Sequence, residues 1–240
     1  MFLPLCVAFF IVQFIFATLF IKAGWPESTK KGFYFKMVSA TVFVAFGFYC
    51  AYTAGFETAY SRLIPLGLIL GWVGDFCLTF DPFLKGKPKS VTAAVYIFGG
   101  VAFLAGHVIY IIAFFKLMKE AGKSVNFLFF AVAAALMCLA VLLKFLLKVK
   151  LGKIGAGVAV YAAMILTMLT AACFAAFGYG DSMILRVALP LGAFLFVCSD
   201  FSLALKMFSA ERFDTLEIRT IYIYTYFFAQ MLIAGSIAPV

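Results

Sequence analysis

Residues 62–80 read RLIPLGLILGWVGDFCLTF, an apolar stretch whose interior holds one charged side chain, Asp75. Its length matches the roughly 20 apolar residues with which an α-helix crosses the hydrocarbon core of a bilayer. The stretch lacks the strict alternation of apolar and polar residues that marks a strand of a membrane barrel. It therefore predicts a membrane-spanning helix that carries a carboxylate inside the bilayer.

The rest of the chain has the same apolar character. Of its 240 residues, 66% are hydrophobic and 12% are charged, and the mean hydropathy is +1.14. Soluble domains contain about 45–50% apolar and about 25% charged residues, so the composition excludes a soluble globular protein. We predict an all-α integral membrane protein, a single domain over residues 1–240 with eight transmembrane helices. The predicted spans are residues 2–22, 35–54, 62–80, 93–115, 125–147, 154–177, 184–206 and 219–238.

The basic residues predict the orientation of the chain. Its net charge is +9, but the Lys and Arg residues lie between apolar runs, where they meet lipid phosphates. We therefore expect membrane lipids, and no nucleic acid, as partners. Odd-numbered connections hold 14 basic residues and even-numbered connections hold 5. The positive-inside rule then places the odd-numbered connections in the cytoplasm and both termini on the other side of a bacterial inner membrane or, in a eukaryote, of the endoplasmic reticulum membrane.

The stretch around Asp75 recurs 125 residues later. Residues 187–205 read VALPLGAFLFVCSDFSLAL and repeat both the Pro-Leu-Gly and the Asp-Phe of the first stretch. The two segments run in the same direction, which predicts two four-helix halves, about residues 1–120 and 121–240, in a parallel repeat. The alternative is a chance similarity between two Leu-rich helices. The repeat would place Asp75 and Asp200 at one depth, facing one another across a central cavity.

Asp75 and Asp200 differ from the other eight acidic residues, because only these two lie inside apolar spans. A charge in the middle of a membrane costs about 2.5–3.5 kcal/mol on insertion scales, so an intramembrane carboxylate indicates a functional role. Two carboxylates that share a site can hold different protonation states, as general acid–base catalysis requires. We predict that both aspartates are catalytic. The alternative is that each one only hydrogen-bonds a neighbouring helix.

Other polar side chains within the spans are candidates for supporting this pair. His107 and Tyr110 are three residues apart and Tyr226 and Gln230 are four apart, so each pair shares a helix face. Each pair is equally consistent with ordinary hydrogen bonding between helices. One histidine and six scattered cysteines predict no metal site. The two remaining candidates are Lys36, which can pair with a phosphate or simply flank its span, and Tyr161, for which core packing is the alternative.

Several segments together match a known pattern. They are Gly74-Asp75 in a Leu- and Phe-rich helix, LAGHVIY at residues 104–110, GAFLFVCSDFSLA at 192–204 and YFFAQ at 226–230. Over nearly its whole length, the chain resembles the YhhN-like membrane protein family, whose vertebrate members include lysoplasmalogenase. The Ser-Asp motif with its Leu-Ala tail is the most specific piece, and it adds Ser199 to the candidate site.

The resemblance implies a hydrolase that acts on a lysophospholipid. Lysoplasmalogenase cleaves the vinyl ether of a lysoplasmalogen to a fatty aldehyde and a glycerophospho-choline or glycerophospho-ethanolamine. One protonated aspartate would protonate the alkenyl carbon, while the other would stabilise the oxocarbenium-like cation or orient water, as carboxylate pairs do in glycosidases. This chemistry requires no metal and no organic cofactor. The lipid would enter from the cytoplasmic leaflet, with its phosphate near Lys36 or a neighbouring basic residue.

A proton-coupled transporter of small molecules or lipids is the alternative function. Internal repeats and intramembrane aspartates are common among such transporters. Helices broken by Gly or Pro at the repeat axis would favour this alternative, but Pro65 and Pro190 lie near the starts of their spans. An intramembrane aspartyl protease is disfavoured, because the chain has no Pro-Ala-Leu segment.

Overall fold

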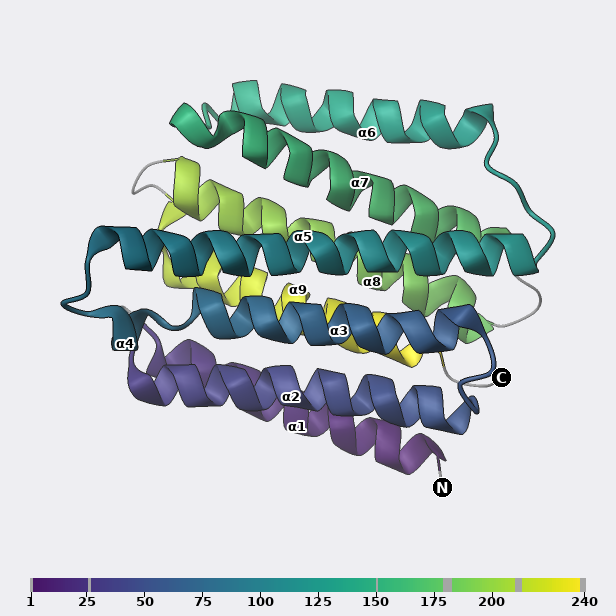
Figure 1. Ribbon diagram of the computed structural model, residues 1–240, viewed down its shortest axis with the longest axis horizontal. Coiled ribbons are helices and arrows are strands. Elements are labelled where there is room, and N and C mark those ends of the chain that lie inside the picture. The colour runs from purple at the N-terminus through teal and green to yellow at the C-terminus, as the bar shows by residue number, and fades with distance from the viewer. Residues whose placement is uncertain (1, 26, 150, 179–182, 210–212, 238–240) are drawn as a thin grey trace.

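The computed structural model describes residues 2–25, 27–149, 151–178, 183–209 and 213–237. All regular structure among these residues is helical. Long helices lie side by side along one axis and join through short connections at the two ends of the molecule (Figure 1). Helix α1 begins and helix α9 ends at the same end of the molecule.

Eight long helices are present in the described part of the chain, one for each predicted span. They are α1 (Phe2–Ala23), α2 (Lys30–Thr53), α3 (Ala59–Leu78), α5 (Lys89–Glu120), α6 (Phe127–Leu146), α7 (Gly155–Gly178), α8 (Met183–Phe208) and α9 (Leu216–Gly235). Two short elements, α4 (Asp81–Leu84) and the 3-10 helix η1 (Gly152–Ile154), lie in connections where no element was predicted. Helix α5 also extends beyond its predicted span at both ends.

Four of the long helices have a polar N-terminal capping residue. Thr29, Thr58, Asn126 and Thr215 each accept a hydrogen bond from the backbone N–H three residues later. Such caps satisfy backbone donors that the first turn of a helix leaves unpaired. At the start of α3 the cap is reciprocal, because Ser61 also bonds the backbone of Thr58. The helix starts are thus determined by local sequence.

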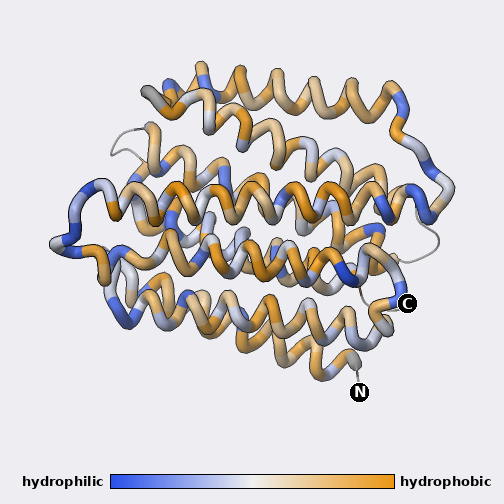
Figure 2. Tube along the Cα trace, in the orientation of Figure 1, coloured by the Kyte–Doolittle hydropathy of each residue, from blue (hydrophilic) through white to orange (hydrophobic). Residues whose placement is uncertain are grey.

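Seven helices of the described chain, α1 to α3 and α5 to α8, are long and apolar enough to cross a membrane. This is the architecture of a multi-pass membrane protein, and the polar residues gather at its two ends (Figure 2). Helix α9 is outside this set. It carries Glu217 and Arg219 in its first turn and Tyr226 and Gln230 further on. Its polar side chains lower its hydropathy, so the eighth span stays a prediction.

The packing of the helices follows the same order in both predicted halves. Helix α3 packs closely on α5 and α8 packs on α9, while α2 contacts α3 and α7 contacts α8. The halves meet where α5 packs on α7 and where α2 packs on α9. Helix α6 lies at one edge against α7 and buries a single side chain, Phe129 (Figure 1). This order is compatible with a parallel repeat, which remains a prediction.

The core between the helices is rich in aromatic side chains. Phe43, Phe114, Phe196 and Phe227 are fully buried, and smaller apolar residues fill the space around them. Among the described residues the structure also buries a set of polar side chains: Gln13, Ser39, Ser61, Asp75, Thr79, His107, Thr170, Ser199, Ser202, Arg219, Gln230 and Ser236. Buried polar groups require partners, so their contacts identify the candidate site.

Candidate functional site

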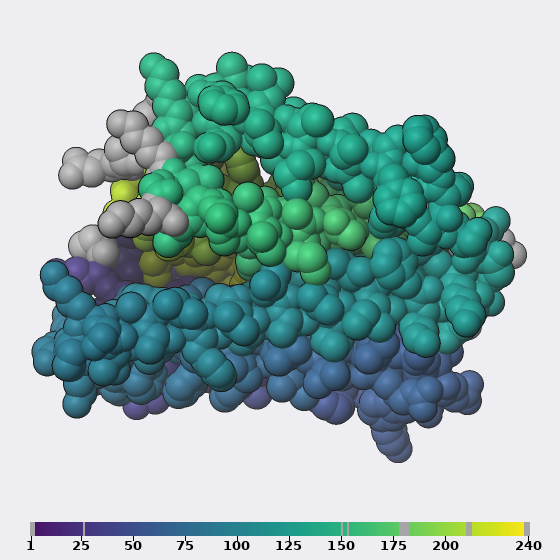
Figure 3. Space-filling view, turned by 45° about the horizontal axis from the view of Figure 1, so that its top comes forward, coloured from purple at the N-terminus to yellow at the C-terminus, as the bar shows by residue number. Residues whose placement is uncertain are grey.

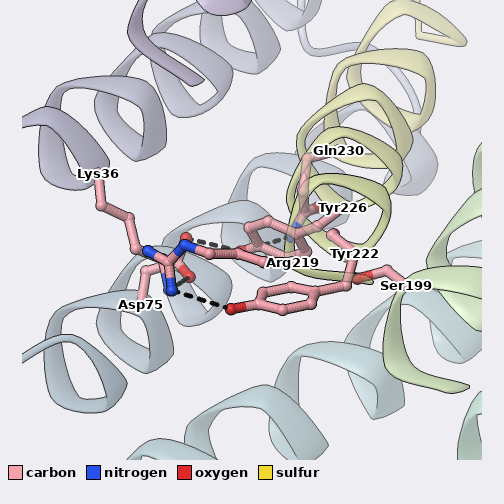
Figure 4. A network of polar contacts seen from close by, with 7 residues as sticks. All are labelled: Lys36, Asp75, Ser199, Arg219, Tyr222, Tyr226 and Gln230. Carbon is pink, nitrogen blue, oxygen red and sulfur yellow. Dashed lines mark hydrogen bonds and ion pairs between the residues drawn. The ribbon is translucent and has the colours of Figure 1, made fainter. Parts of the chain in front are cut away.

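Asp75 lies in the last turn of α3, and its side chain is only 1% exposed. Lys36, near the start of α2, forms an ion pair with it, with 2.9 Å between Nζ and Oδ1. Tyr226 of α9 donates its hydroxyl to the second carboxylate oxygen at 2.8 Å. Both oxygens of this carboxylate therefore have a donor, and side chains of three helices meet around it (Figure 4).

A chain of buried hydrogen bonds continues from Asp75 into the core. Gln230 donates its amide Nε2 to the hydroxyl of Tyr226 at 3.3 Å, and Tyr110 donates its hydroxyl to the amide oxygen of Gln230 at 2.8 Å. Gly71 makes room for this arrangement, because a Cβ there would lie 2.8 Å from Nε2 of Gln230. Tyr226 and Gln230, which share a face of α9, are thus joined by a hydrogen bond. Tyr110 completes their network.

Asp200 has a different environment. Tyr161 of α7 donates its hydroxyl to Oδ2 of Asp200 at 2.7 Å, and both side chains are half-buried. Among the described residues no cation forms an ion pair with Asp200, in contrast to the pair between Lys36 and Asp75. One carboxyl group of the predicted pair therefore faces a positive charge, and the other faces a neutral hydroxyl.

His107 lies beside the Asp200 pair. Its ring contacts Tyr161 edge-to-face at 5.3 Å between centroids and Phe196 at 4.8 Å. The side chain is buried, and neither ring nitrogen has a hydrogen-bond partner within the described structure. Leaving buried polar atoms without a partner is costly, so these nitrogens are suited to a polar group of a ligand. His107 and Tyr110 share α5 but belong to different networks.

Phe196 links the two aspartate environments. Its ring packs edge-to-face on Tyr226 at 5.5 Å and on His107 at 4.8 Å between centroids. Contacts therefore run from Asp75 through these three rings and Tyr161 to Asp200. No hydrogen bond joins the two carboxyl groups directly in the described part of the chain.

The two carboxyl pairs have the same spacing in sequence. Lys36 lies 39 residues before Asp75, and Tyr161 lies 39 residues before Asp200. Each pair joins the second and third long helices of its predicted half, α2 to α3 and α7 to α8. All four residues are candidates in the sequence, but their pairing is seen only in the structure. The offset of 125 residues that relates Asp75 to Asp200 also relates Lys36 to Tyr161, and this signal was missed.

Ser199 and Arg219 have roles that the sequence did not indicate. Ser199 donates its hydroxyl to the backbone oxygen of Tyr222 at 2.9 Å, so it joins α8 to α9. Arg219, which counted only as a flanking charge, is buried and lies 3.4 Å from the Tyr222 hydroxyl through Nη1. Its side chain extends from α9 toward Lys36 and Asp75 (Figure 4).

A hollow opens on the face between α5 and α7, with α9 and the end of α8 visible behind it (Figure 3). Gly100 of α5 and Gly157 of α7 border open space, since a Cβ on either would meet no atom within 4 Å. Gly100 shares a face of α5 with His107, and Gly157 shares a face of α7 with Tyr161. Two separate apolar hollows, one lined by Cys6 to Phe14 of α1 and Phe228, the other by residues of α6, α7 and α8, include neither aspartate.

Comparison with known proteins identifies the family. The family model described as the YhhN family matches residues 32–237, which contain every residue of the two aspartate networks. No curated protein matches the chain, and no solved structure matches it. Since the matched segment covers most of the chain, the protein belongs to the YhhN family.

Proposed function

We propose that this protein is a membrane-embedded hydrolase of the lysoplasmalogenase type, which cleaves the vinyl ether of lysoplasmalogens. One observation carries the proposal: two carboxyl groups within the helix bundle, linked by packed aromatic side chains, have unequal partners, a cation at Asp75 and a neutral hydroxyl at Asp200. Acid–base chemistry on an alkenyl ether needs such a division, because one group must donate a proton while the other carries negative charge. Family membership supports the same reaction class.

Asp200 is the general acid in this proposal. Tyr161 occupies Oδ2, so Oδ1 is available to carry the proton toward a substrate. A carboxyl group without a cationic partner costs less free energy to bury when it is protonated than when it is ionised. The proton moves from Oδ1 of Asp200 to the alkenyl carbon that is β to the ether oxygen. The carbon bonded to that oxygen becomes the positive end of an oxocarbenium ion.

Asp75 supplies the negative charge. Its ion pair with Lys36 and its hydrogen bond from Tyr226 hold the carboxylate in place, and preorganised charge of this kind stabilises a developing cation. Water then attacks the cationic carbon and returns a proton to Asp200. The resulting hemiacetal breaks down to the aldehyde and the glycerophospho-alcohol.

The hollow between α5 and α7 is the proposed route for the lipid. It opens between the two helices that carry His107 and Tyr161, and a Cβ on Gly100 or Gly157 of these helices would meet no atom within 4 Å. The unpartnered nitrogens of His107 would bind the ether oxygen or the attacking water. The odd-numbered connections hold most of the basic residues. The end of the bundle at which α3 and α8 finish therefore faces the cytoplasm.

The test is an assay of purified full-length protein with three lysolipids that differ only at the sn-1 bond: alkenyl, saturated alkyl and acyl. We expect aldehyde release from the alkenyl lipid alone, since only a vinyl ether is activated by protonation at carbon. Asp200→Asn protein, handled identically, is the control for contaminating activity. A wild-type protein that releases no more aldehyde than this variant would contradict the proposal.

The transporter alternative has less support. Helices α3 and α8 remain continuous through Pro65 and Pro190, whereas transporters commonly bind their cargo where helices are unwound. The buried and fully partnered carboxylate of Asp75 is also better suited to a fixed charge than to a proton carrier.

A further inference from the structure

Arg219 lacks the partners that a buried guanidinium normally has. Its side chain lies in the first turn of α9 at 7% exposure. Within the described residues its Nε has no hydrogen-bond partner, no carboxylate lies within ion-pairing distance, and the bond to Tyr222 is long at 3.4 Å. Arginine is almost never buried without a counter-charge, because the desolvated cation is costly.

A second cation lies beside it. The guanidinium carbon of Arg219 lies 5.0 Å from the centroid of the Phe20 ring, and Nζ of Lys36 lies 5.6 Å from the same centroid. Asp75 neutralises one of these two positive charges through Lys36. With Asp200 protonated, as proposed above, the cluster retains one positive charge. A lipid phosphodiester carries one negative charge and would balance it.

Gly24 leaves the space in which the guanidinium of Arg219 lies. Gly24, at the end of α1, faces the guanidinium so closely that a Cβ there would collide with Nη2. Only a residue without a side chain leaves Arg219 room in this position. The first turn of α9 also presents the positive end of a helix dipole, which adds to the attraction for an anion.

The depth of these groups matches the layout of a lysophospholipid. Arg219 lies in the first turn of α9, within about 5 Å of the helix end. Asp200 lies about 12 Å from the end of α8, by its rise per residue. The headgroup phosphate would therefore sit at the shallower level, and the bond to be cleaved, one glycerol unit away, at the deeper one.

We propose that Arg219, together with Lys36, binds the phosphate of a lysophospholipid headgroup. This inference deepens the proposed function and rests on it for the identity of the lipid. The guanidinium offers forked donors that match phosphate oxygens, and the Lys36 ammonium, paired with Asp75, adds further N–H donors. The site would select phospholipids over neutral ether lipids that have the same tail.

The experiment measures binding, without turnover, to full-length protein in detergent. The probes are a saturated 1-O-alkyl lysophosphatidylethanolamine, the 1-O-alkylglycerol with the same chain, and inorganic phosphate. The wild type should bind the phospholipid more tightly than the glycerol. Arg219→Gln should weaken phospholipid binding about 10- to 100-fold and leave alkylglycerol binding unchanged. Arg219→Lys should lie between them, and Gly24→Ala, which displaces the guanidinium, should weaken phospholipid binding too.

Arg62→Gln is the matched control, because Arg62 is exposed at the opposite end of the bundle. It should bind all probes like the wild type. Unchanged phospholipid binding in Arg219→Gln overturns the inference. It is also overturned if the Arg219 and Gly24 variants lose as much affinity for the alkylglycerol as for the phospholipid. If inorganic phosphate alone binds as tightly as the phospholipid and depends on Arg219, the ligand is free phosphate and the lipid assignment is wrong.

The saturated ether has no vinyl bond, so this measurement is independent of catalysis. Wild-type protein that binds it through Arg219 but releases no aldehyde from the alkenyl lipid would reject the hydrolase and retain the phosphate site. Aldehyde release with no effect of Arg219 on binding would reject the phosphate site and retain the hydrolase.

Discussion

Lys36 and Tyr161 occupy equivalent positions, because each contacts the aspartate that follows it by 39 residues, at 2.9 Å and 2.7 Å respectively. The same geometry thus occurs twice with different chemistry, a cation in one half and a phenol in the other. A duplicated helix arrangement with one altered partner would produce this difference. The unequal partners are what assign different roles to Asp75 and Asp200 in the proposed mechanism.

Replacing either aspartate by asparagine should abolish vinyl ether hydrolysis while the protein stays folded. Asparagine preserves the shape of the side chain but neither donates a carboxylic proton nor carries charge, and losses of at least about 10²–10⁴-fold are expected. Because the two groups act together, the double variant should be little worse than either single one. Near-normal turnover in either variant would disprove the acid–base pair. Loss of proton-driven solute uptake instead would favour the transporter.

Lys36→Met should destabilise the protein, because the buried Asp75 would lose its counter-ion and would either stay charged without a partner or have to take up a proton. Breaking a buried ion pair costs about 3–5 kcal/mol. The double variant Lys36→Met/Asp75→Asn should recover most of this stability, since no uncompensated charge remains, yet stay inactive. Thermal unfolding in detergent measures the first effect and aldehyde release the second. A double variant no more stable than Lys36→Met would refute the coupling.

Tyr161→Phe and His107→Ala should reduce turnover less than the aspartate variants do. We assign both residues to positioning Asp200 and the attacking water, and losses of about 10–100-fold are typical when such supporting groups are removed. Tyr226→Phe, on the Asp75 side, should fall in the same range. Steady-state kinetics with the alkenyl lysolipid provide the comparison. A complete loss in Tyr161→Phe would mean that the phenol itself takes part in proton transfer.

Gly71→Ala should disturb the Asp75 network without changing any of its polar groups. The new Cβ would lie 2.8 Å from Nε2 of Gln230, so the amide that bonds both Tyr226 and Tyr110 must shift. We expect reduced turnover with a modest loss of stability. Gly235→Ala is the matched control, because a Cβ at Gly235 would make only ordinary van der Waals contact with Phe46, at 3.5 Å. Equal effects of the two substitutions on turnover would indicate a general loss of helix packing.

Cysteine labelling tests the orientation of the chain. A cysteine introduced at Lys87, between α4 and α5, should react with a membrane-impermeant reagent only from the cytoplasmic side. Glu57, between α2 and α3, provides the opposite control, and its cysteine should be labelled from outside in intact cells. Labelling of position 87 from outside would invert the predicted topology and the proposed route for the lipid.

Local sequence determined the helices of this protein and the depth of its buried acids. An apolar run long enough to cross a bilayer must form a helix there, because lipid offers no partners for backbone groups. The capping residues Thr29, Thr58 and Thr215 set helix starts by contacts three residues away. Asp75 and Asp200 stood out because they are charged residues inside such runs.

Only the tertiary structure decided which side chains meet. Periodicity shows which residues share one face of a helix, but it does not show which neighbour that face contacts. Thus Tyr110 bonds Gln230 while His107, one turn earlier, contacts Tyr161. Arg219 resembles any flanking arginine in sequence, and it becomes a buried cation only because α1 presents Gly24 and Phe20 beside it. Such contacts join residues that are far apart in the chain, and helix packing alone brings them together.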